Sequence, residues 1–156
     1  MPSASINKDI PCTKENLIKM VLDIEKYPEF VPWCLDGKIH SKNDMGDKIE
    51  ITADLTIGKS FFNETYKSHV IYEKSSDLIH VTNIGGPLKH LENRWLFKRK
   101  GKHSEIDFHV DFELKNKILN TLMIKSFDIG LKKTAKLVLK NIYLKTKDDF
   151  LFKKLL

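Results

Sequence analysis

The sequence has 156 residues, of which 41% are hydrophobic and 31% are charged, as in one folded domain that buries about 70% of the surface its unfolded chain exposes. It contains no run of 18 apolar residues and its start lacks the basic and apolar regions of a secretory signal, so we expect a cytoplasmic protein without a membrane span. The net charge of +6 favours an anionic partner, but Arg occurs only at Arg94 and Arg99, which argues against specific recognition of DNA.

The N-terminal part predicts a strand around residues 6–12 and then a helix. Thr13 is a suitable N-cap, and the segment "NLIKMVLDI" at residues 16–24 places its apolar residues on one helical face. Cys12 and Cys34 have no metal-site or disulfide spacing, so both are expected to be free thiols.

The segment "YPEFVPWC", residues 27–34, carries four large apolar side chains and two prolines. Each proline removes a backbone donor and crowds the preceding turn, so residues 27–33 should form a separate short helix or turn. The aromatic residues Tyr27, Phe30 and Trp33 then either present an apolar surface or plug one end of the core.

The middle of the chain alternates apolar and polar residues with a period of two, which indicates strands. Strands are predicted near residues 38–43, 48–57, 62–72, 78–84, 91–99 and 105–114. Turns are predicted at residues 44–47, 58–59, 75–77, 85–87 and 100–102. This spacing favours an antiparallel meander.

After Lys115 the apolar period becomes helical again, and one long helix is predicted to about residue 144, interrupted at Gly130, with a tail at residues 145–156. The sheet must cover its apolar face, and this helix carries the longest apolar stripe. We therefore expect an α+β fold in which a curved antiparallel sheet of about seven strands wraps a long C-terminal helix, with short N-terminal helices and space between sheet and helix.

Catalytic motifs are missing from the sequence. None of the six histidines lies in H-E-x-x-H, and there is no G-x-S-x-G, P-loop or G-x-G-x-x-G. Five polar residues share one face of the last strand: Glu105, Asp107, His109, Asp111 and Glu113. A metal site or an acid/base site is conceivable there, but the spacing along a strand spreads these groups apart, so a solvated face is favoured. We therefore expect no metal site and no enzymatic activity.

Several side chains are expected to face the interior of the sheet. The alternation places Glu64 and Tyr66 on the concave side, unless the register slips by one residue and Glu64 lies outside. Leu55, Trp95, Phe97 and Phe108 have inward spacing and are either plain core or cavity lining. Phe127 belongs to the apolar stripe of the last helix.

Basic residues gather in two places. One is a hairpin tip with Lys98, Arg99, Lys100 and Lys102, and the other is a helix stripe with Lys132, Lys133, Lys136 and Lys140. Both are expected to be solvated surface or to contact an anionic membrane or ribosomal RNA.

Several of these segments together resemble one family. "YPEFVPWC", "ADLTIG", Phe62-Asn63-Glu64-Thr65-Tyr66, "GPLKHLENRWLF" and "DFHVDFEL" are similar to the coenzyme Q-binding proteins of the START-like, or polyketide cyclase-like, superfamily, whose bacterial members are also called ribosome association toxins. The resemblance covers residues 6–143. It implies a helix-grip fold over one domain, residues 1–156, and a hydrophobic tunnel. By motif match it assigns Leu55 and Trp95 to the cavity. Gly130 and the Lys-rich helix around it depart from the family pattern.

The resemblance implies a non-enzymatic carrier of ubiquinone or a related prenylquinone that supports quinone biosynthesis or respiratory electron transport, without a cofactor. Such a carrier would work in the cytoplasm, peripheral to the inner membrane, and touch lipid through Phe30, Val31 and Trp33. One alternative is a ribosome-binding inhibitor of subunit association. Another is a polyketide cyclase or aromatase, which would need Glu64 and Tyr66 as its acid and base.

Overall fold

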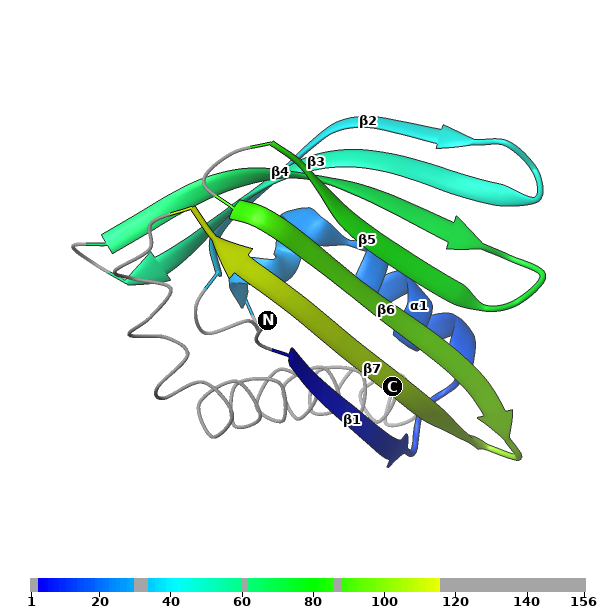
Figure 1. The fold of residues 1–156 in the computed structure, drawn as a ribbon. Coiled ribbons are helices and arrows are strands. Elements are labelled where there is room, and N and C mark those ends of the chain that lie inside the picture. The colour runs from blue at the N-terminus through cyan, green and yellow to red at the C-terminus, as the bar shows by residue number, and fades with distance from the viewer. Residues whose placement is uncertain (1–2, 30–33, 60–61, 86–87, 116–156) are drawn as a thin grey trace.

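The computed structural model describes residues 3–29, 34–59, 62–85 and 88–115 (Figure 1). Two helical segments, α1 (Lys14–Leu22) and the 3-10 helix η1 (Ile24–Glu29), follow the first strand. The strands are β1 (Ser3–Ile10), β2 (Cys34–Asp44), β3 (Lys48–Lys59), β4 (Phe62–Glu73), β5 (Leu78–Gly85), β6 (Leu88–Lys100) and β7 (His103–Leu114).

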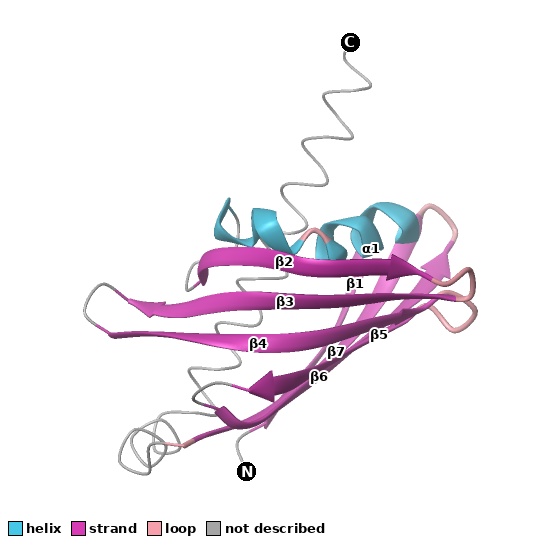
Figure 2. Ribbon diagram, turned by 90° about the horizontal axis from the view of Figure 1, so that it is seen from above, coloured by secondary structure: helices cyan, strands magenta, loops and turns pink. Residues whose placement is uncertain are grey.

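The strands form one seven-stranded sheet in the order β1-β7-β6-β5-β4-β3-β2, with every neighbouring pair antiparallel. Strands β2 to β7 are a meander, and β1 pairs with β7 at the far edge. The sheet is strongly bent, and α1 and η1 lie together on one side of it (Figure 2). The described strands agree in number and pairing with the curved sheet expected from the sequence.

The face of the sheet toward α1, here called the inner face, is apolar because of the two-residue alternation. In β3 the alternate residues Ile51, Ala53 and Leu55 are buried, and α1 adds Leu17 and Val21 to the same core. The sequence pattern therefore assigned the inner face correctly on β3.

Helix α1 begins where the sequence expected, because the Thr13 hydroxyl accepts a hydrogen bond from the Asn16 N–H. It ends at Leu22, two residues before the predicted end. The 3-10 helix then starts at Ile24 rather than at Tyr27, and Pro28 lies inside it. A 3-10 helix is short and tolerates this interruption.

Edge strand β2 lies close to η1. A Cβ atom on Gly37 would lie 2.4 Å from the carbonyl oxygen of Ile24, so only glycine fits this position. The β2–β3 register shifts twice, between Cys34 and Asp36 and between Ile39 and Ser41. These irregularities are bulges, which bend a strand and increase its twist.

Three further predictions of strand and turn bounds were wrong. The first strand is Ser3–Ile10 rather than residues 6–12, because its pairing with β7 starts at Ser3 and ends at Ile10. Residues 58–59 are not a turn, because Gly58 and Lys59 continue β3 in register with Asn63 and Phe62. The first residue of the predicted 85–87 turn, Gly85, ends β5.

The long C-terminal helix and tail predicted from the sequence lie outside the described residues, as does Gly130. In the described part of the chain no helix is long and apolar enough to cross a bilayer.

Candidate functional site

Three aromatic side chains form a cluster on the inner face. Trp95 and Phe97 are buried on β6, with their ring planes 5° apart and their centroids 6.4 Å apart. Phe108 on β7 is the cross-strand partner of Trp95, and the two ring centroids are 4.3 Å apart. The structure thus brings three of the expected site residues together as a continuous apolar surface.

A second group of expected residues lies on the same face, on β3 and β4. Leu55 and Tyr66 are cross-strand partners on β3 and β4, and both are buried. Glu64 precedes Tyr66 by two residues, so it shares the inner face and is partly exposed there. The predicted register of β4 is therefore confirmed, since Ser68 and Val70 are also buried.

Tyr27 reaches this group from η1. Its side chain packs against the core, and its hydroxyl donates a hydrogen bond to the Val21 carbonyl. Cys34, at the start of β2, is buried, and its thiol donates to the Asp36 carbonyl at 3.4 Å. Each of Tyr27, Cys34 and Tyr66 interacts electrostatically with the other two, so they form one polar cluster.

The polar cluster is uncharged at neutral pH. Burial raises the pKa of Cys34 to about 11, and burial followed by the neighbouring Cys34 raises the pKa of Tyr66. Burial and then the neighbouring Tyr66 raise the pKa of Tyr27. A protonated thiol is a poor nucleophile, so these groups are suited to hydrogen bonding rather than to covalent catalysis.

Three other polar side chains of the inner face have hydrogen-bond partners. The Ser68 hydroxyl donates to the Ala53 carbonyl at 3.3 Å, and the Asn93 side-chain oxygen accepts from the Trp95 indole N–H at 3.1 Å. The Asn83 side-chain oxygen accepts the Leu91 N–H at 2.8 Å. These three side chains are therefore hydrogen-bonded, as is usual for polar groups in apolar surroundings.

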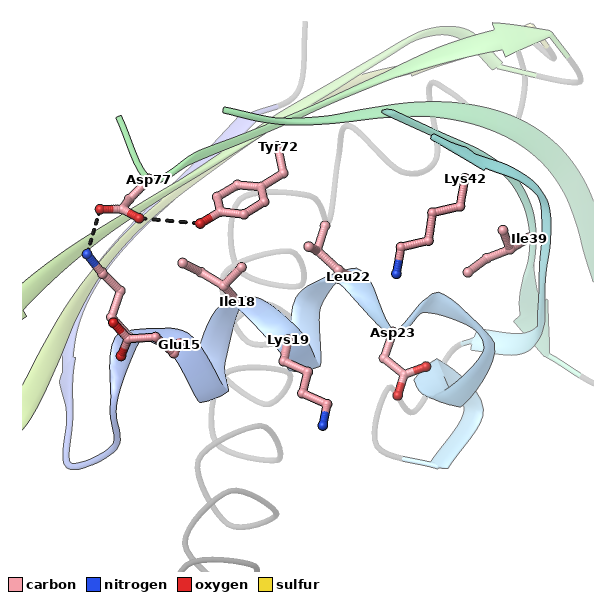
Figure 3. Close-up of a pocket in the computed structure, with 10 residues that line it drawn as sticks. Glu15, Ile18, Lys19, Leu22, Asp23, Ile39, Lys42, Tyr72 and Asp77 are labelled. Carbon is pink, nitrogen blue, oxygen red and sulfur yellow. Dashed lines mark hydrogen bonds and ion pairs between the residues drawn. The ribbon is translucent and has the colours of Figure 1, made fainter. Parts of the chain in front are cut away.

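A cleft of about 520 Å³ lies between α1 and the β2–β4 side of the sheet (Figure 3). Ile18, Leu22 and Ile39 line it with apolar surface. At one end Lys14 pairs with Asp77 at 2.7 Å, and the Tyr72 hydroxyl donates to the same carboxylate at 3.4 Å. The cleft contains none of the residues selected from the sequence.

The polar face of β7 is occupied by contacts within the protein. Glu105 accepts from Asn7 at 2.7 Å and pairs with Lys100 at 3.0 Å, and Asp107 also accepts from Asn7. His109 and Asp111 are 3.0 Å apart. No group of three or more His, Cys, Asp or Glu side chains suited to a metal is present among the described residues.

At the β6–β7 hairpin the basic residues are exposed, as expected. Two of them are engaged: Arg99 pairs with Glu15, and Lys100 pairs with Asp9 at 3.6 Å as well as with Glu105. Within the described ranges, Lys98 and Lys102 have no ion pair, so they carry the available positive charge of this tip.

The remaining expected site residues lie outside the described residues: Phe30, Val31, Trp33, Phe127, Lys132, Lys133, Lys136 and Lys140. Sequence analysis missed Cys34 as a member of the polar cluster. Its position directly after the aromatic segment was the only signal, since a lone cysteine has no diagnostic spacing.

Comparison with known families and sequences gives a consistent result. A family model described as "Polyketide cyclase / dehydrase and lipid transport" matches residues 11–135. Ribosome association toxin RatA of Rickettsia prowazekii is 31% identical over 136 residues, which are 85% of this chain and 90% of that protein. Mitochondrial coenzyme Q-binding protein COQ10 of Dictyostelium discoideum is 29% identical over 125 residues, which are 78% of this chain and 60% of that protein.

Solved structures show the same fold. An 18 kDa protein of Caulobacter crescentus has a TM-score of 0.76 at 24% identity and covers 95% of this chain and 97% of its own. A START superfamily protein of Mycobacterium smegmatis has a TM-score of 0.75 at 16% identity and covers 95% of this chain and 99% of its own. The described sheet therefore belongs to a START-like fold.

Proposed function

We propose, from the premise that this chain belongs to the polyketide cyclase, dehydrase and lipid transport family, that it is a non-enzymatic carrier of a hydrophobic molecule of the prenylquinone type. The observation that carries the proposal is the aromatic cluster of Trp95, Phe97 and Phe108 on the inner face. A relative named for binding coenzyme Q supports the choice of ligand.

Hydrophobic burial provides the driving force for such binding. Each five-carbon isoprene unit contributes roughly 3 to 4 kcal/mol when it leaves water, at about 0.8 kcal/mol per buried CH₂. Association and ordering cost about 4 to 15 kcal/mol, so a few buried units are enough. We place this carrier in the cytoplasm, where it would exchange its ligand with the surface of the inner membrane.

Mass spectrometry under native conditions tests the proposal on protein purified from its host. We expect a co-purifying prenylquinone, and we expect the loaded protein to transfer it to liposomes. The absence of both a bound prenylquinone and transfer would contradict the carrier function.

Fluorescence locates the ligand on the inner face. The chain has only two tryptophans, so Trp33→Phe leaves Trp95 as the single indole. A short-chain quinone should quench Trp95, and Phe108→Ala should weaken that binding because Phe108 packs on the indole. Leu96→Ala is the matched control, since Leu96 lies on the opposite face of β6. Equal effects of the two truncations would argue against this location.

Ribosome association is the second candidate function, and two observations favour it. A relative at 31% identity is named for it, and Lys98 and Lys102 are exposed at the hairpin tip without an ion pair among the described residues. Basic side chains that contact RNA release counterions, so binding should weaken steeply with salt.

Co-sedimentation with ribosomal subunits tests this candidate. The double variant Lys98→Gln with Lys102→Gln should reduce the bound fraction. It should also make the slope of log K against log[salt] shallower by about two, one for each lost phosphate contact. Lys38→Gln with Lys67→Gln removes the same charge from exposed positions elsewhere and should leave binding unchanged. Sedimentation that responds equally to both pairs would exclude the hairpin tip as the contact.

A further inference from the structure

The Tyr66 hydroxyl is an unmatched polar group on the inner face. Tyr66 is only 6% exposed, yet its hydroxyl makes no hydrogen bond to any described residue. Nearby hydroxyls differ in this respect: Ser68 donates to the Ala53 carbonyl, and Tyr27 donates to the Val21 carbonyl. A buried hydroxyl without a partner costs free energy, so this group has a strong tendency to acquire one.

Neighbouring donors do not compete for that partner. The Tyr27 hydroxyl donates its hydrogen bond to the Val21 carbonyl, and the Cys34 thiol donates to the Asp36 carbonyl. The Tyr66 O–H is therefore the available donor of the polar cluster. Burial raises the pKa of Tyr66, so the proton is retained at physiological pH. Among the described residues, no Lys or Arg acts on the Tyr66 hydroxyl, so these residues supply no countercharge for an anion beside it.

We propose that the Tyr66 hydroxyl donates a hydrogen bond to a carbonyl oxygen in the head of the hydrophobic ligand, and that the site thereby prefers a neutral carbonyl-bearing head over a hydrocarbon or a carboxylate. This assignment rests on the proposed carrier function and adds to it the position and chemistry of head-group recognition. Leu55, the cross-strand partner of Tyr66, supplies apolar surface beside the donor.

Tyr66→Phe tests the assignment, because it removes one oxygen and keeps the ring. We expect an unchanged or higher melting temperature, since no described residue loses a hydrogen bond. The affinity for decylubiquinone, measured by calorimetry, should fall about fivefold to tenfold, which is typical of one lost neutral hydrogen bond. The affinity for undecylbenzene, which has an apolar tail and no carbonyl, should not change, and dodecanoate should bind more weakly than decylubiquinone.

Tyr72→Phe is the matched control on the same strand, outside the polar cluster. It removes a hydroxyl that is already bonded to Asp77, so it should lower the melting temperature without changing the ratio of quinone to hydrocarbon affinity. The same loss of stability in Tyr66→Phe would show that the Tyr66 hydroxyl is bonded within the protein and would overturn the assignment.

The outcomes separate this inference from the carrier function. If the wild-type protein binds decylubiquinone and Tyr66→Phe leaves the ratio of quinone to hydrocarbon affinity unchanged, head-group recognition by Tyr66 is wrong and the carrier function stands. Tighter binding of dodecanoate than of decylubiquinone also overturns the assignment. If the wild-type protein binds none of the three probes, both proposals fail.

Discussion

Gly37 has no room for a side chain, because a Cβ atom at this position would lie only 2.4 Å from the Ile24 carbonyl oxygen. Gly37→Ala must push η1 away from β2, and we expect a loss of about 1 to 3 kcal/mol in the free energy of unfolding, as for other overpacked sites. Urea denaturation measures this loss.

The control for Gly37 is its exposed neighbour Lys38. Lys38→Ala should change the free energy of unfolding by less than about 0.5 kcal/mol, as is usual for surface positions. A Gly37→Ala protein as stable as the Lys38→Ala protein would show that η1 and β2 can separate without cost.

Individual residues were predictable from the sequence only where the pattern fixes the face of a strand. Trp95, Phe97 and Leu55 are buried, as the alternation of apolar and polar residues predicts. The polar cluster was not predictable, because Tyr27, Cys34 and Tyr66 come from three different elements, η1, β2 and β4.

At the scale of elements, the Lys14–Asp77 pair joins the first turn of α1 to the β4–β5 turn across the end of the cleft (Figure 3). Asp77 adopts a φ of 52°, which Asn tolerates well, so Asp77→Asn removes the charge and keeps the turn. We expect Lys14→Met and Asp77→Asn to show a coupling energy of about 1 kcal/mol in a double-mutant cycle, since both side chains are largely shielded from solvent.

Lys26 and Asp23 provide the comparison for that cycle. The Lys26 Nζ and Asp23 Oδ2 atoms are 3.5 Å apart, and both side chains are more exposed than those of Lys14 and Asp77. Their coupling should be close to zero. A Lys14–Asp77 coupling that is no larger would mean that the pair does not hold α1 to the sheet.

Element types were predictable and element ends were not. Period-two alternation identified all the strands of the meander, but Gly58 and Lys59 resemble a turn and are held in β3 by pairing with β4. Likewise, nothing local marks Ile24 as the start of a 3-10 helix, because its position depends on packing against β2 at Gly37. Pairing and packing with distant segments decided both boundaries.

For the whole molecule, buried protonated groups make stability depend on pH. Burial raises the pKa of Cys34 from the usual 9.0 to about 11, and it raises the pKa of Tyr66 and Tyr27 above 10.0. Below pH 9 the thiol is protonated in both states, so its contribution is fully present. Above pH 9 the unfolded chain loses this proton first, and the contribution is lost as the pH rises toward 11.

We therefore expect the free energy of unfolding to fall between pH 9 and pH 10, by roughly 1 kcal/mol per pH unit for a group in this window. Urea denaturation at pH 8, 9 and 10 measures it. Cys34→Ala should have a shallower fall than the wild-type protein. An equal slope in both proteins would show that Cys34 ionises in the folded state as easily as in the unfolded chain.

Among the described residues, β1 and β2 are the edge strands of the bent sheet, and an exposed edge strand can pair with other chains. At one edge, β2, the two shifts in register interrupt the regular row of backbone donors and acceptors that an incoming strand would need. These irregularities thus make β2 a poor template for pairing with further copies of the chain. An interrupted edge of this kind lowers the tendency of the folded protein to aggregate through strand pairing.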